Sequence, residues 1–140
     1  MNILLPIDGS DYTKRMLAYL AANNELLGAG HRYTLFTAVP PIPPHAARYI
    51  DRQTLERYYA DQAEPVLRTS EAFARQQGWD IHTAFEAVHA ASGIASYASA
   101  HDFDLIVMGT HGHSALGNVV LGSVTTGVLA RCKVPVLLIR

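Results

Sequence analysis

The 140-residue sequence has one cysteine, few charged residues and no long apolar segment, and each shortage excludes a class of protein. With Cys132 as its single cysteine, the chain cannot form an internal disulfide framework, which favours a reducing compartment such as the cytoplasm. Charged residues make up only 16% and the formal net charge is -1, so a basic surface for nucleic acid is not expected. No apolar run approaches the roughly 20 residues that a membrane-spanning helix needs. We therefore expect a cytoplasmic protein with no membrane insertion.

Short apolar runs and helical patterns alternate along the whole chain. The apolar runs predict strands over residues 2–7, 33–39, 79–88, 105–108 and 134–139. Between them, apolar spacing predicts a helix that ends at Gly28, and further helices over residues 51–77, 92–101 and 123–131. Strict alternation of this kind indicates parallel strands joined by right-handed crossovers, with helices on both faces. The sequence predicts the α/β class, as a doubly wound sheet in a single domain over residues 1–140.

Prolines and aromatic residues add local expectations. Four prolines within residues 40–44 predict an extended loop after the second strand. Pro65 lies inside a helical pattern and predicts a kink or a break. Tyr58, Tyr59 and Phe73 share the spacing of the apolar positions of that helix, so we expect them in the core. The third strand alternates polar and apolar residues, which is typical of an edge strand.

The main functional signal lies between residues 105 and 140. An apolar strand is followed by a loop that contains Gly109 and Gly112, and Gly122 with Ser123 then opens a helix. Open α/β sheets bind ligands at the carboxyl ends of their strands, and a helix amino end favours an anion. The pattern therefore favours a phosphate-bearing ligand, although a tight turn alone could also need these glycines. Because the loop has no lysine, backbone N–H groups and Mg²⁺ would have to meet the ligand's charge.

The spacing Gly109-x2-Gly112-x9-Gly122-Ser123 resembles the nucleotide-binding signature of the universal stress protein family. The turn over residues 6–10, the block over residues 104–112 and the closing run over residues 135–139 are similar to that family as well, so the resemblance covers essentially the whole chain. It implies a five-stranded parallel sheet of order 3-2-1-4-5 and a homodimer formed through the last strand, from Val134 to Ile139. It also implies ATP, with Mg²⁺, at the carboxyl edge of the sheet.

Carried over by position, the resemblance implies that Asp8 and the backbone around Val39 contact the adenine and the ribose. Gly109, Gly112, Gly122 and Ser123 would hold the phosphates. Neighbouring residues complete the implied nucleotide-binding set: Pro6, Ile7, Met108, Thr110, His111, His113 and Val124. Asp8 could instead be a turn residue that caps the first helix. His113 stands where such sequences commonly have arginine, which replaces a permanent cation by a side chain that is mostly neutral at pH 7.

These observations lead to one main hypothesis and two alternatives. The main hypothesis is an ATP-binding switch, in which the nucleotide orders the loop over residues 40–52 and the glycine loop and so changes a surface that a protein partner recognises. Arg48 and Arg52 in the first of these loops could reach the phosphates or could be solvated. The first alternative is a slow ATPase or a self-phosphorylating protein with Ser123 or Thr110 as acceptor. The second is a dimeric interaction module that binds no nucleotide.

Overall fold

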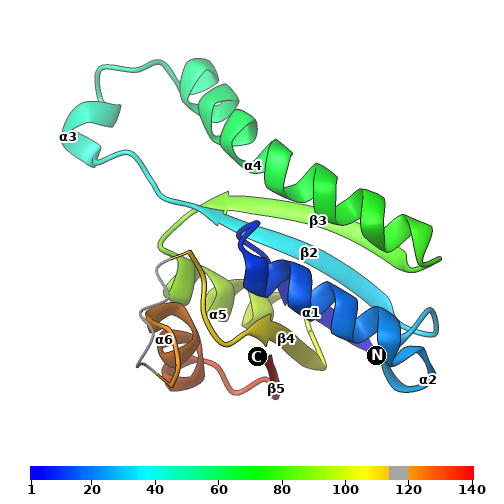
Figure 1. Ribbon diagram of the computed structural model, residues 1–140. Helices are drawn as coiled ribbons and strands as arrows, with labels where there is room; N and C mark the ends of the chain where they lie inside the picture. The colour runs from blue at the N-terminus through cyan, green and yellow to red at the C-terminus, as the bar shows by residue number, and fades with distance from the viewer. Residues whose placement is uncertain (114–119) are drawn as a thin grey trace.

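The computed structural model describes residues 1–113 and 120–140. Strands and helices alternate along this part of the chain, with two short additional helices (Figure 1). The elements are β1 (Asn2–Pro6), α1 (Asp11–Ala22), α2 (Asn24–Leu27), β2 (Arg32–Val39), α3 (Pro44–Ala47), α4 (Arg52–Gln76), β3 (Asp80–Ala87), α5 (Ala90–Ala100), β4 (Leu105–Gly109), α6 (Ser123–Arg131) and β5 (Val136–Ile139).

The five strands form one parallel sheet of order β3-β2-β1-β4-β5, which confirms the predicted topology. From β1 the chain adds β2 and β3 on one side, and it then crosses to add β4 and β5 on the other. The connections that leave β1 and β4 therefore diverge between two neighbouring strands. This is the topological switch point, where an open α/β sheet leaves a crevice.

Each face of the sheet is covered by helices, as predicted. Helices α1 and α4 cover one face and α5 and α6 the other (Figure 1). The alternation of side chains along β1 divides its residues between the two cores: Ile3 and Leu5 pack with α1 and α4, as does Ile7 just after the strand, whereas Leu4 packs with α5 and α6. Helices α5 and α6 also pack closely together, because a Cβ atom built on Gly127 would lie 2.5 Å from the Cβ of Ala91.

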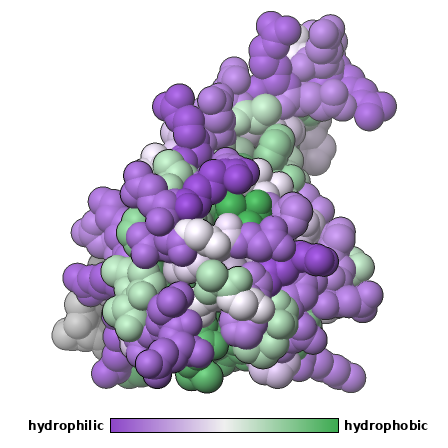
Figure 2. Space-filling model, turned by 90° about the vertical axis from the view of Figure 1, so that its right-hand side faces the viewer, coloured by the Kyte–Doolittle hydropathy of each residue, from purple (hydrophilic) through white to green (hydrophobic). Residues whose placement is uncertain are grey.

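The end of the sheet where the strands begin is hydrophilic over most of its surface, and its hydrophobic patches are small (Figure 2). No helix within residues 1–113 and 120–140 is long and apolar enough to cross a membrane.

Three local predictions need correction, and a fourth is narrowed. Pro65 causes no break, because α4 runs without interruption from Arg52 to Gln76, and a kink at Pro65 stays a prediction. Proline has no N–H to donate to the backbone carbonyl four residues earlier, but Pro65 is exposed, so water can donate to that carbonyl instead. The buried Ala63 and Leu67 hold the helix on the sheet. Tyr58 is not in the core, since it is 43% exposed.

The first helix is shorter than its apolar pattern predicts, because it is interrupted at Asn23. The Asn23 side-chain amide donates to the carbonyl of Tyr19 at 2.8 Å, and its backbone leaves the helical region. Asparagine side chains compete for backbone groups in this way, which explains the separate α2. The proline-rich loop is not extended throughout, because Pro44 occupies the first position of α3, where a proline is compatible with a helix.

Tyr33 offers a test of the core. Its side chain is fully buried on β2, and its hydroxyl lies within hydrogen-bonding distance of the carbonyls of Leu27 and Gly28, the latter at 3.0 Å. Burial raises the pKa of this hydroxyl to about 12. The variant Tyr33→Phe leaves both carbonyls without this donor, so we expect the free energy of unfolding to fall by about 1–3 kcal/mol in urea titrations. Tyr49→Phe, at a position that is 80% exposed, is the control and should change it little.

Candidate active-edge cavity

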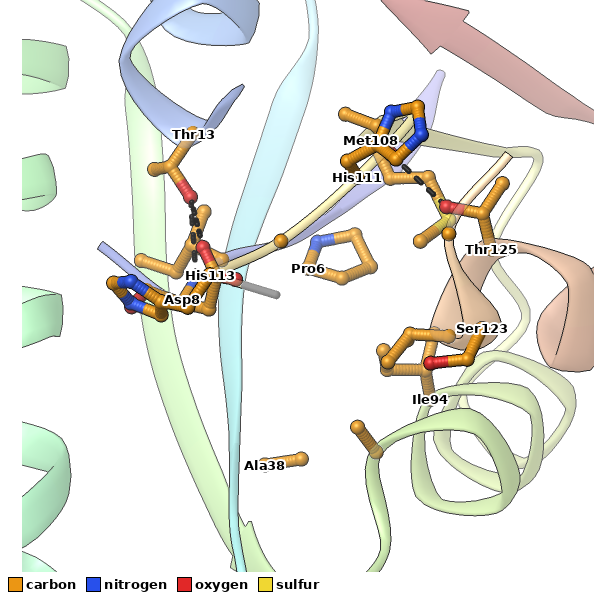
Figure 3. A pocket seen from close by; sticks show the side chains of 16 residues that line it. Pro6, Asp8, Thr13, Ala38, Ile94, Met108, His111, His113, Ser123 and Thr125 are labelled. Atoms are coloured by element: carbon orange, nitrogen blue, oxygen red, sulfur yellow. Dashed lines mark hydrogen bonds between the residues drawn. The ribbon is translucent and has the colours of Figure 1, made fainter. Parts of the chain in front are cut away.

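A cavity of about 530 Å³ opens at the switch point, beyond the carboxyl ends of β1 and β4 (Figure 3). It is lined by residues from the β1–α1 connection, β2, α5, β4, the loop after β4 and α6. These are Pro6, Ile7, Asp8, Thr13, Ala38, Ala90, Ile94, Met108, Gly109, His111, Gly112, His113, Gly122, Ser123, Val124 and Thr125. Segments that are far apart in the sequence thus meet around one hollow.

The walls of the cavity differ in polarity. Apolar side chains come from the ends of the strands and from the first turns of α5 and α6, and they include Pro6, Ala38, Ile94 and Met108. Polar groups come from the β1–α1 turn, the loop after β4, and the first turns of α1 and α6. Asp8, Thr13 and His113 lie together on one side of the cavity, whereas Ser123 and Thr125 lie on the opposite side with α6 (Figure 3).

The Asp8 carboxylate organises the turn after β1. Its Oδ1 accepts hydrogen bonds from the Ser10 backbone N–H and the Thr13 hydroxyl, both at 2.9 Å. Burial alone would raise the pKa of Asp8, but the hydrogen bonds from Ser10 and Thr13 and the nearby imidazole of His113 outweigh it and leave the pKa below its ordinary value. Asp8 is therefore an ionised turn residue before α1, but it does not cap this helix, whose N-cap is Ser10 without a side-chain cap hydrogen bond.

The glycines of the loop after β4 are required by close contacts. A Cβ atom at Gly112 would lie 2.5 Å from Oδ2 of Asp8, so the carboxylate occupies the space that a side chain would need. At Gly109 a Cβ would lie 2.8 Å from the Cβ of Tyr12 on α1, so a side chain there would prevent the close packing of α1 on the end of β4. At Gly122 a Cβ would lie 3.2 Å from the Thr110 carbonyl oxygen. Close packing against α1 therefore requires a glycine at position 109. At position 112 the missing side chain lets the Asp8 carboxylate lie directly against the loop.

Helix α6 starts at the cavity wall. The backbone N–H of Gly122 donates to the Thr110 carbonyl at 2.8 Å, and the Thr125 hydroxyl lies 3.1 Å from the carbonyls of Gly109 and Thr110. The first N–H groups of a helix have no partner inside it, and here they belong to residues that line the cavity. The Ser123 side chain is exposed and its hydroxyl is directed into the cavity (Figure 3). Together these groups can donate to an anion.

The two histidines of the loop have different surroundings. His113 Nε2 lies 2.7 Å from the backbone carbonyl oxygen of Asp8 and so bridges the two loops that follow β1 and β4. His111 Nδ1 lies 3.1 Å from the Thr110 hydroxyl, and its ring is 5.1 Å from the ring of Tyr12. In the part of the chain that the structure describes, no group of three His, Cys, Asp or Glu residues could hold a metal ion.

All but two of the residues that the sequence predicts for the site line this cavity. Val39 does not, because its side chain is buried on the face of α1 and α4 and its carbonyl accepts from the Val88 N–H at 3.0 Å. Thr110 is buried below the loop, where its N–H donates to the carbonyl of Ile139 at 2.9 Å. The nucleotide contacts of the predicted residues stay predictions.

Sequence reasoning missed five lining residues: Thr13, Ala38, Ala90, Ile94 and Thr125. Ala38 could have been found, because successive strand residues point to opposite faces and position 38 shares the face of Phe36, opposite to that of position 39. Thr13 and Thr125 are polar residues in the first turns of their helices; Thr125 directly follows the predicted Val124, and Thr13 comes five residues after the predicted Asp8. Arg48 and Arg52 do not line the cavity: Arg52 pairs with Glu56 at 2.7 Å, and Arg48 lies over the ring of Tyr49.

Comparison with known proteins decides the family. The family model described as the universal stress protein family matches residues 1–140. The chain belongs to the universal stress protein family. A curated universal stress protein of Thermus aquaticus is 34% identical over 139 residues, which cover 99% of this chain and 98% of that protein.

Solved universal stress proteins share the fold. The universal stress protein UspA of Lactobacillus plantarum has a TM-score of 0.80 at 24% identity. The superposition covers 100% of this chain and 97% of the UspA chain. The universal stress protein of Archaeoglobus fulgidus, solved in complex with dAMP, has a TM-score of 0.70 at 20% identity, with 100% of this chain and 98% of that chain covered. A family member of Arabidopsis thaliana, solved with AMP bound, has a TM-score of 0.69 at 14% identity, with 99% and 90% covered.

The lowered pKa of Asp8 predicts a pH-dependent stability. A carboxyl whose pKa is lower in the folded state than in the unfolded chain stabilises the fold fully above its unfolded value, near 3.8, and this stabilisation is lost as the pH falls through the folded value. We therefore expect the stability difference between the wild type and Asp8→Asn to be constant near neutral pH and to shrink below about pH 4. Urea unfolding at a series of pH values measures it. The exposed Asp61→Asn is the control, and a difference that persists unchanged to pH 2 contradicts the prediction.

Proposed function

We propose that the cavity binds an adenine nucleotide, with ATP and Mg²⁺ as the natural ligand, and that the bound state is read by a protein partner in the cytoplasm. The observation that carries this proposal is the direct contact between the two loops at the switch point. On one side of the cavity the Asp8 carboxylate fills the space beside Gly112 and the Asp8 carbonyl lies 2.7 Å from His113 Nε2, while the amino end of α6 faces the same hollow from the other side. The cavity lies between the turn over residues 6–10 and the glycine loop, the two segments in which the family resemblance places nucleotide contacts.

The size and polarity of the cavity suit a nucleotide. Its volume of about 530 Å³ lies within the range of small-molecule sites. The apolar side chains of Pro6, Ala38, Ile94 and Met108 provide a surface for a base, while Asp8 provides an acceptor for ribose hydroxyls through Oδ2, since Oδ1 is already bonded within the turn. That the dAMP and AMP complexes named above have this fold supports an adenine nucleotide.

The phosphates would lie against the amino end of α6. Ser123 would donate its hydroxyl, and the N–H groups of the first turn would donate from the backbone. Helix α5 also begins at the cavity, since Ala90 and Ile94 line it, so a second helix amino end faces the same anion. No lysine or arginine is among the described residues that line the cavity, so bound Mg²⁺ would supply the positive charge that a polyphosphate needs.

The side chains around the cavity favour nucleotide binding without rapid hydrolysis of ATP. The Asp8 carboxylate already accepts two hydrogen bonds and its pKa is lowered, which makes it a weak base toward water. We therefore propose a switch, in which occupancy changes the surface formed by the glycine loop and by the segment after β2 that carries α3. Slow hydrolysis and phosphorylation of Ser123 are the alternatives, and phosphate release or label incorporation by the purified protein detects them.

Calorimetry with Mg-ATP tests the proposal. We expect a dissociation constant near 1 μM, or about -8 kcal/mol. Ser123→Ala removes a hydroxyl that bonds to a charged group, so its affinity should be about tenfold lower. Ser96→Ala, at an exposed position of α5 that does not line the cavity, is the matched control and should bind as the wild type does. Absence of heat up to millimolar nucleotide would overturn the proposal.

We also propose a homodimer formed through β5. This strand lies at the edge of the sheet, and its outer side has no strand partner within the described residues. A bare apolar edge invites pairing, and a two-fold copy of the same strand satisfies it. Sedimentation should therefore report twice the mass of the chain at micromolar concentration, and a stable monomer there contradicts the dimer.

A further inference from the structure

We propose that the edge of the sheet at β5 is a docking site for a protein partner, which adds an extended segment with acidic residues alongside this strand. The inference rests on the proposed function in one respect, that a protein partner reads the nucleotide-bound state, and it names the surface and the chemistry of that partner. Because the proposed homodimer uses the same edge, the partner and a second copy of the chain compete for it.

The outer side of β5 has no strand partner among the described residues. On its inner side, the carbonyls of Pro135 and Ile139 accept hydrogen bonds from N–H groups of β4 and of the residue after it, at 2.8 and 2.9 Å. Alternate residues of a strand direct their backbone N–H and C=O groups to opposite sides, so Val136 and Leu138 direct theirs outward. An added strand can pair with these groups, which is how extended peptides bind to sheet edges.

The charged side chains around this edge are all cationic. The 12 Asp and Glu residues of the chain lie within residues 1–104, whereas residues 105–140 contain Arg131, Lys133 and Arg140 and no carboxylate side chain. Lys133 precedes β5, Arg140 follows it, and Arg131 ends α6. The three side chains are exposed, and none of them forms an ion pair with another described residue.

The elements near β5 do not neutralise these cations. Strand β4 and helices α5 and α6 contain no Asp or Glu, and the only carboxylate of α1, on Asp11, pairs with Lys14 at 3.3 Å. The carboxylate of Asp104, just before β4, accepts from the Asn2 N–H at 2.7 Å, on the side of β1. The negative charge that complements this edge therefore comes from another molecule.

A second copy of the chain satisfies the backbone of β5 but not its charge. An antiparallel pair of two β5 strands brings the Lys133 end of each strand toward the Arg140 end of the other, and like charges repel. The side chains of Val136, Leu137 and Leu138 are half-buried and apolar, so an added strand needs apolar residues in its middle. A segment with apolar residues in its middle and acidic residues at its ends complements both features.

Fluorescence anisotropy with two labelled peptides tests the inference. The acidic peptide is Glu-Glu-Val-Thr-Val-Thr-Glu-Glu, and the neutral peptide has Gln in place of each Glu. We expect the acidic peptide to bind about tenfold more tightly, and its affinity to fall as NaCl is raised from about 0.05 M to about 0.5 M. Lys133→Glu should bring the two affinities close together. Arg68→Glu, at an exposed arginine of α4 without an ion pair to a described residue, is the matched control and should keep the preference.

Two further measurements test the backbone pairing and the shared edge. The acidic peptide methylated on alternate backbone nitrogens leaves the protein unchanged and lacks the N–H groups of a strand edge, so it should bind at least about tenfold more weakly. In sedimentation, saturating acidic peptide should convert the homodimer to a peptide-bound monomer. A homodimer that persists at saturation contradicts a shared edge.

The outcomes separate this inference from the nucleotide site, which calorimetry with Mg-ATP tests independently. If both peptides bind equally, if neither binds up to millimolar concentration, or if the methylated peptide binds as its parent does, the docking edge is wrong. A single-stranded oligonucleotide of the same charge that binds more tightly than the acidic peptide also overturns it. If the acidic peptide binds as expected and Mg-ATP does not bind, the docking edge stands and the nucleotide switch is wrong.

Discussion

The contact between Asp8 and the loop after β4 is the constraint on which the rest of the site depends. The carboxylate occupies the space of a missing side chain at Gly112, and the Asp8 carbonyl holds the His113 ring. The same carboxylate fixes the start of α1 through Ser10 and Thr13. One short turn is therefore in contact with both the start of α1 and the glycine loop after β4.

The sheet could be predicted from the sequence because its signals are local and repeated. Four of the strands are short apolar runs and the third alternates polar and apolar residues, each with a helix or a turn on either side, and this order of elements indicates a parallel sheet with two covered faces. The order of the strands came from the family resemblance, and the structure confirms it. The departures have two physical causes. Solvent exposure tolerates Pro65 on the outer side of α4, and a local hydrogen bond of the Asn23 side chain interrupts the first helix despite its apolar pattern.

The site was harder to predict than the fold, because its lining depends on which side chains of different helices, strands and loops come together in space, and sequence spacing does not show this. The family signature names Gly112, Gly122 and Ser123, and the structure brings them to one hollow with Asp8. It does not name Ala90 and Ile94, which reach the hollow only because α5 packs against α6 through Gly127. The bond between His113 and Asp8 joins residues 105 positions apart, and no periodicity or spacing in the sequence indicates it.

The hydrogen bond from the Thr110 N–H to the Ile139 carbonyl links the glycine loop to the last strand of the sheet. The Thr110 carbonyl also accepts from the Gly122 N–H, so the last strand, the base of the loop and the start of α6 are joined through the backbone of one residue. Both backbone polar groups of Thr110 are therefore engaged, one with the outermost strand and one with the start of α6. A single buried residue under the glycine loop thus connects the cavity wall to the rim of the sheet.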